Sequence, residues 1–239
     1  MKIVRIDKKD WSAGLKKLRK AYRLIGPVQE GDGHRFKPLA EGTEPDLAFG
    51  NTRLSAKEII YPQSEEMFAF SLDENQPDHH QMQEVAKDYS PQAVVGLRPC
   101  DAKAIELVRL NFDTEDYQDP YWLNLYEATT LVGLACDRPC GTCFCTTAGC
   151  GPYHEEGLDV LLVDDGPSYL AKPLTDKGEA LATPGRVGDS DLHRRVQGQE
   201  QIQESSVRRV DLLPGHSLEA QDILHFGEGL AVGSRQGHS

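Results

Sequence analysis

The sequence of 239 residues has no apolar run long enough to cross a bilayer. Its first twenty residues include basic side chains, but no apolar stretch follows them as in a signal sequence. We therefore expect a cytoplasmic protein with no membrane partner. Thiols stay reduced in the cytoplasm, so clustered cysteines there indicate metal ligands more than disulfides.

Positive charge is outnumbered by negative charge. The 26 Lys and Arg residues are outnumbered by 38 Asp and Glu residues, which gives a formal net charge of -12. No basic segment is concentrated enough to bind a phosphate backbone, so we expect no nucleic-acid partner. The hydrophobic fraction of 38% is typical of a soluble protein, and 239 residues are enough for one substantial core or for a core domain plus an appendage.

Familiar catalytic motifs are missing as well. No G-x-G-x-x-G follows a predicted strand, and there is no P-loop, nucleophile elbow or H-E-x-x-H. The sequence therefore gives no indication of substrate turnover. Its chemistry is concentrated in its cysteines.

Five of the six cysteines lie between Cys136 and Cys150, and the sixth is Cys100 in the segment LRPCDAKAI. Structural zinc prefers paired C-x2-C knuckles, and only Cys140 and Cys143 have that spacing. A redox C-x-x-C usually opens a helix, whereas this one lies in a glycine-rich loop. The tight C-x-C of Cys143 and Cys145, with a remote further ligand, favours an iron–sulfur cluster, and zinc is the alternative.

The first third of the chain has weak secondary-structure patterns. A short strand is expected at Lys2–Ile6, then a helix that Asp10 caps and that Gly26-Pro27 stops. One further strand is expected at Arg35–Leu39. A short helical pattern occupies Pro77–Ser90.

The middle of the chain is more regular. Continuous apolar runs at Ala93–Leu97, Thr129–Ala135 and Leu158–Val163 predict buried strands, and Asp101 is placed to cap a helix after the first. This order predicts an α/β fold with a mostly parallel or mixed sheet flanked by helices, and a mixed α+β fold is the alternative.

Two distant cysteines have equivalent positions in this layout. Cys100 and Cys136 each follow the carboxyl end of a predicted buried strand, where open α/β sheets form ligand sites. We expect the two to converge on one site. Cys100 would also lie at a helix N-terminus, where the helix dipole stabilises a thiolate.

Longer stretches of the sequence resemble a known family. They are NTRLSAKEIIYPQSEEMFAF, VVGLRPCDAKAIELV, DPYW and TTLVGLACDRPCGTCFCTTAGCGPYHEEGLDVLLVDDGPSYLAKPL. From about Phe36 to Leu174 the chain resembles the amino-terminal domain of a family of iron–sulfur electron-transfer subunits. That family includes the beta subunit of cytoplasmic sulfhydrogenases, which are nickel–iron hydrogenases, and an iron–sulfur subunit of anaerobic sulfite reductase.

The resemblance implies a set of ligands for one iron–sulfur cluster of the 4Fe–4S type. Cys140 and Cys150 stand where the family has other residue types, so they are accessory candidates. His154, close to the loop, is a further candidate ligand. The four cysteines that match the family are Cys100, Cys136, Cys143 and Cys145.

The resemblance also implies a role in an oxidoreductase complex. Such a protein relays electrons between a flavin-bearing subunit and a hydrogenase or sulfite-reductase-type subunit. It turns over no substrate of its own. The family continues into a ferredoxin-like module, but here no cysteine follows Cys150. We therefore expect an α/β domain over residues 1–182 with a single relay point, and a polar, weakly helical to disordered tail over residues 183–239. A zinc-stabilised or metal-free assembly module is the alternative function.

Overall fold

The computed structural model describes residues 3–77 and 79–182, so the predicted tail lies outside the described residues. Within that part of the chain, no helix combines the length and the apolarity of a membrane span.

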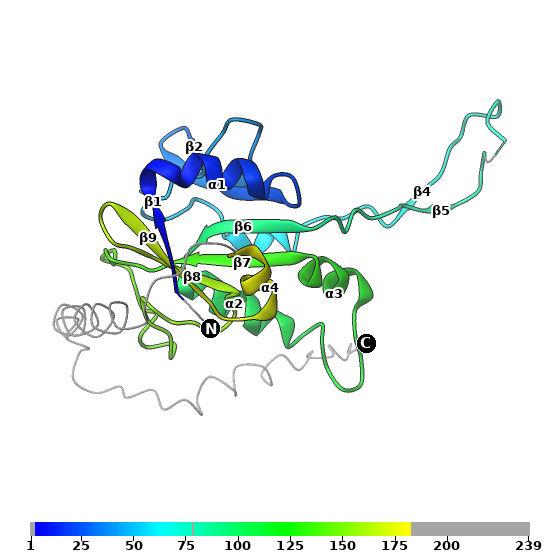
Figure 1. Cartoon of the computed structure of the whole chain (residues 1–239). Coiled ribbons are helices and arrows are strands. Elements are labelled where there is room, and N and C mark those ends of the chain that lie inside the picture. The colour runs from blue at the N-terminus through cyan, green and yellow to red at the C-terminus, as the bar shows by residue number, and fades with distance from the viewer. Residues whose placement is uncertain (1–2, 78, 183–239) are drawn as a thin grey trace, which may run out of the picture. The chain divides into compact units, whose positions relative to one another are not determined.

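The core of the fold is a seven-stranded sheet of order β1-β9-β8-β7-β6-β2-β3 (Figure 1). Strands β2, β6, β7 and β8 run parallel, and antiparallel neighbours flank them on both sides. This mixed sheet confirms the predicted α/β fold. The strands are β1 (Val4–Asp7), β2 (Arg23–Glu30), β3 (Gly33–Pro38), β6 (Gln92–Leu97), β7 (Thr129–Leu134), β8 (Val160–Asp164) and β9 (Ser168–Pro173).

Helices cover both faces of the sheet, and Figure 1 shows α1 and α2 on opposite sides of β6 and β7. Residues of α2, α3 and η2 pack with one face, whereas Trp11 of α1 and Leu181 of α4 pack with the other. Strands β6 and β7 are buried along their whole length, as their continuous apolar runs predict. The helices are η1 (Lys8–Asp10), α1 (Trp11–Leu18), η2 (Ala56–Ile59), α2 (Pro99–Arg109), α3 (Pro120–Glu127) and α4 (Asp176–Leu181).

The prediction that Gly26-Pro27 stops the first helix is wrong. Helix α1 already ends at Leu18, and both residues lie inside β2. Pro27 is tolerated there because the pairing of β2 with β6 extends only from Arg23 to Ile25. Beyond Ile25, β2 pairs with β3 alone, so the missing N–H breaks no bond to β6.

The helix predicted within Pro77–Ser90 is also wrong. In the described part of that segment the only regular element is β5 (Gln83–Glu84), which pairs antiparallel with β4 (Phe68–Ala69). Both strands are exposed, so no core contact fixes a helix there. A third correction concerns Asp101, which lies in the first turn of α2 and is not its cap. The N-cap is Arg98, because Pro99 has the fixed φ suited to the first helical position.

Candidate functional site

The parallel pairing of β6 and β7 places two cysteines the same number of residues beyond a pair of register partners. Leu97 of β6 is the register partner of Gly133 of β7. Cys100 follows Leu97 by three residues, and Cys136 follows Gly133 by three. Both therefore lie at the carboxyl edge of the sheet, beyond neighbouring strands, as the sequence predicts.

A bulge at Gly96 produces this alignment. The register runs from Val95 opposite Val132 to Leu97 opposite Gly133, so β6 contains one extra residue. Gly96 has φ +93, and a Cβ there would lie 2.8 Å from Cδ2 of Leu47. Only glycine suits both the left-handed backbone and the lack of space.

The other five cysteines lie on one closed loop. The backbone N–H of Cys136 donates to the carbonyl oxygen of Pro152 at 3.0 Å, which joins the two ends of the loop. Inside it, the N–H of Cys150 donates to the carbonyl oxygen of Cys145 at 2.9 Å. Cys150 is 8% exposed, whereas Cys140 and Cys143 are exposed.

The thiols of Cys140 and Cys143 are in contact, with Sγ atoms 3.3 Å apart. The Thr142 hydroxyl and the Asn51 amide also lie 3.2 Å from Cys140 Sγ. The Thr142 hydroxyl, the Cys143 thiol, the Thr142 backbone N–H and the Asn51 amide lower the pKa of Cys140 to about 6. Partial desolvation of its sulfur and the hydrogen bond with Cys140 raise the pKa of Cys143 to about 11.

Cys100 behaves differently from the prediction. Cys100 is an exposed residue, but partial desolvation of its thiol, the Asp101 carboxylate and the charges of Cys145, Cys150 and Cys136 raise its pKa to about 12. The thiol is therefore protonated at neutral pH in the metal-free chain. The pKa is raised although Cys100 lies in the first turn of α2, where a helix dipole favours a thiolate.

Arg98 connects the site to a distant loop. Its guanidinium donates to the carbonyl oxygens of Phe49, Gly50 and Ala135, and its Nε is buried without a partner among the described residues. Burial raises the pKa of Cys136, and the positive charge of Arg98 acts in the opposite direction. Arg98 thus supplies positive charge where cysteine thiolates would gather.

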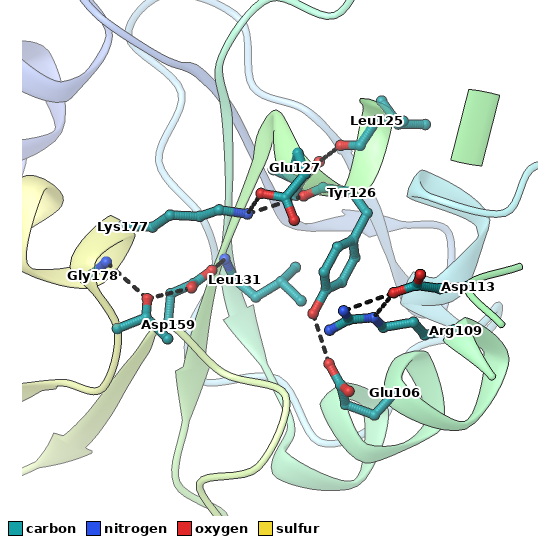
Figure 2. A network of polar contacts seen from close by, with 12 residues as sticks. Glu106, Arg109, Asp113, Leu125, Tyr126, Glu127, Leu131, Asp159, Lys177 and Gly178 are labelled. Carbon is teal, nitrogen blue, oxygen red and sulfur yellow. Dashed lines mark hydrogen bonds and ion pairs between the residues drawn. The ribbon is translucent and has the colours of Figure 1, made fainter. Parts of the chain in front are cut away.

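Helix α2, which begins beside Cys100, is held against α3 by the polar contacts in Figure 2. The Tyr126 hydroxyl of α3 donates to Glu106 of α2 at 2.6 Å. Arg109 forms an ion pair with Asp113 at 2.8 Å, and its guanidinium lies 5.4 Å from the centre of the Tyr126 ring. These contacts fix the helix that carries Cys100.

Some predicted site residues are not brought together. In the described ranges, no three His, Cys, Asp or Glu side chains converge closely enough to hold a metal ion. The Nε2 atom of His154 lies 3.1 Å from Glu156, so one of its ring nitrogens is already engaged. The donor chemistry still fits an iron–sulfur cluster, since the four thiols lie at one edge of the sheet and on one loop, and neighbouring thiols affect the pKa of Cys100 and of Cys136. The ligand assignment itself stays a prediction.

The contact between Asn51 and Cys140 is one that the sequence did not indicate. The Asn51 amide reaches Cys140 across 89 positions of the chain, from the loop whose carbonyl groups bind Arg98. A polar residue after Gly50 is also typical of an ordinary turn. No local pattern reveals the contact.

The fold and the site together define an α/β protein with a cysteine-rich loop at the carboxyl edge of its parallel strands. Comparison with curated proteins shows similarity to sulfhydrogenase 2 subunit beta of Pyrococcus furiosus, with 23% identity over 178 residues. The match covers 74% of this chain and 50% of the relative, so the chain spans about half the length of the protein it matches. No protein-family model and no solved structure matches the chain.

Proposed function

We propose that the chain is an iron–sulfur electron-transfer subunit of a cytoplasmic oxidoreductase complex of the hydrogenase type. The observation that carries this proposal is the position of Cys100 and Cys136, each three residues beyond a register pair of two neighbouring parallel strands. The distant similarity to a sulfhydrogenase beta subunit supports the same class. The α/β domain over residues 1–182 would hold the site, without substrate turnover of its own.

The proposed ligands of one 4Fe–4S cluster are Cys100, Cys136, Cys143 and Cys145. When bound, such a cluster supplies a one-electron redox centre. The chain supplies the thiolates, the loop that encloses them and the nearby charge of Arg98. Because Cys100 and Cys143 are protonated at neutral pH in the metal-free chain, loading the site releases their protons.

The proposed partners are the other members of such a complex. One is a flavin-bearing subunit. The other is a hydrogenase subunit or, alternatively, a subunit of the sulfite-reductase type. The net charge of -12 favours partners with basic docking surfaces. Electron transfer would then proceed through the single relay point of this chain.

Anaerobic purification tests the cofactor directly. We expect a brown protein that contains iron and acid-labile sulfide, bleaches with dithionite and gives an electron paramagnetic resonance signal when reduced. A colourless, iron-free product after anaerobic reconstitution would contradict the proposal.

Serine variants test the ligand assignment. Replacement of Cys100, Cys136, Cys143 or Cys145 is expected to abolish iron binding. The matched control is Cys150→Ser, which removes a thiol from the same loop and is expected to keep the cluster. Equal loss in all of these variants would show that the assignment is wrong.

A zinc-stabilised assembly module is the second candidate. It is favoured by the C-x2-C pair of Cys140 and Cys143, whose sulfur atoms lie 3.3 Å apart. Stoichiometric zinc in a colourless protein, lost in Cys140→Ser, would select this function.

A further inference from the structure

The loop contains a thiol pair that the proposed cluster does not fully use. Cys140 stands outside the proposed ligand set, yet its Sγ lies 3.3 Å from the Sγ of Cys143. Both residues are exposed, so a small molecule can reach the pair.

The backbone of the turn already holds the two residues together. The N–H of Cys143 donates to the carbonyl oxygen of Cys140 at 3.1 Å, and the N–H of Cys140 donates to Cys143 Sγ at 3.1 Å. A disulfide bond is about 2.05 Å long, so the sulfurs need to approach by little more than about 1 Å. Gly141 lies between them with open space around its Cα, which leaves the turn free to tighten.

We propose that Cys140 and Cys143 form a redox-active dithiol that is oxidised by disulfides of small thiols. The Cys140 thiolate attacks one sulfur of the disulfide RSSR and releases RS⁻, which leaves a mixed disulfide on Cys140. The Cys143 thiolate then attacks the Cys140 sulfur and releases the second RS⁻. The two cysteines are oxidised, RSSR is reduced, and the two thiol protons pass to the two released thiols.

Cys140 is the attacking residue because hydrogen-bond donors surround its sulfur. The Asn51 amide donates to Cys140 Sγ, and the Thr142 hydroxyl lies at the same distance of 3.2 Å. Such donors stabilise the thiolate that attacks and, in the reverse direction, the thiolate that leaves. In the described loop, the hydrogen-bond contacts of Cys143 Sγ come from Cys140 alone, through its backbone N–H and its thiol.

The consequence for the cluster rests on the proposed function. Cys143 is a proposed ligand, and a sulfur in a disulfide cannot serve as a thiolate ligand. Oxidation of the pair and loading of the site therefore exclude each other. The chain would accept its cofactor only while the surrounding thiol pool is reduced.

The test uses the full, metal-free chain, reduced and then exposed to glutathione disulfide. Peptide mapping is expected to find one intrachain disulfide, between Cys140 and Cys143. The Cys143→Ser variant is expected to accumulate a mixed disulfide of glutathione with Cys140, because the second attack is lost. The control Cys150→Ser is expected to form the Cys140–Cys143 disulfide at the normal rate. No disulfide, or one between other cysteines, would overturn the proposal.

Asn51→Ala tests the role of the donor. We expect the first step with glutathione disulfide to be about two- to tenfold slower, the range that one hydrogen bond accounts for. If Asn51→Ala keeps its circular dichroism spectrum and reacts with glutathione disulfide at an unchanged rate, the argument that these donors make Cys140 the attacking residue is refuted.

Reconstitution with iron and sulfide separates this inference from the proposed function. The reduced chain is expected to take up iron, and the chain oxidised by glutathione disulfide is expected to take up none until it is reduced. Iron uptake by both forms would overturn the exclusion. No uptake by either form, with the Cys140–Cys143 disulfide still mapped, would refute the proposed function and support the dithiol.

Discussion

The guanidinium carbon of Arg98 lies 4.4 Å from the centre of the Phe49 ring. The same guanidinium donates to backbone carbonyl oxygens on two sides, at Phe49 and Gly50 before η2 and at Ala135 after β7. One side chain therefore joins the end of a central strand to a loop far away in the sequence. A planar group with several donors is suited to this, and an ammonium group is not.

Arg98→Lys is accordingly expected to destabilise the protein although it keeps the charge. The loss of the ring contact and of the forked hydrogen bonds is expected to lower the free energy of unfolding by about 1–3 kcal/mol. Urea denaturation measures this change. The matched control is Arg138→Lys, since that side chain is 92% exposed and its change is expected to stay within about 0.5 kcal/mol. Equal effects of the two substitutions would contradict a bridging role for Arg98.

The bulge in β6 gives a second prediction. Gly96→Ala adds a Cβ in a left-handed conformation, 2.8 Å from Leu47, and is expected to cost about 2–5 kcal/mol of stability. Thermal or urea denaturation measures this loss. Gly14→Ala in helix α1 meets nothing within 4 Å and is expected to stabilise by about 0.5–1 kcal/mol. A well-tolerated Gly96→Ala would show that the bulge does not need glycine.

The reactivity of Cys140 gives a pH prediction for the metal-free chain. Its pKa is lowered from 9.0 to about 6, so the thiolate is already present at neutral pH. Alkylation of Cys140 by iodoacetamide, followed by mass spectrometry, is expected to rise through about pH 6 and to level off above about pH 7. In the urea-unfolded chain the same rise is expected near the ordinary value of 9.0. A folded-state midpoint at that higher pH would contradict the donor arrangement around Cys140.

The polar contact between α2 and α3 gives a fourth prediction. Tyr126→Phe removes the hydroxyl that donates to Glu106 and is expected to cost about 1–3 kcal/mol in urea denaturation. Tyr117→Phe is the control, because Tyr117 is 58% exposed and its contact with Asp119 is 3.3 Å long. Similar small changes in both variants would mean that the contact in Figure 2 adds little to the stability of α2.

The central strands could be predicted from the sequence because their burial leaves a direct mark on composition. Ala93–Leu97 and Thr129–Ala135 are continuous apolar runs, as strands covered on both faces must be. Local patterns could not predict that Pro27 lies inside a strand or that the segment Pro77–Ser90 contains no helix in its described part. The first depends on where β6 stops pairing with β2, and the second depends on the absence of a covering core around the described strand β5.

Some features of the candidate site could likewise be predicted from the sequence, and others could not. The positions of Cys100 and Cys136 beyond two neighbouring strands follow from where those strands end, which the sequence reveals. The contact of Asn51 with Cys140 depends on a loop folded back across 89 positions, which no local pattern encodes. The pKa of Cys100 depends on burial and on neighbouring charges that only the folded chain assembles.

The order of the strands also sets the order of events during synthesis. Among the described strands, β1 pairs only with β9, so that Val4 meets Ala171. At ribosomal speeds of about 5–20 residues per second, Val4 waits on the order of ten seconds for its neighbour to be made. The cysteine loop leaves the ribosome before that moment. Its thiols thus meet the cellular metal and thiol pools while the first strand of the chain still has no place in the sheet.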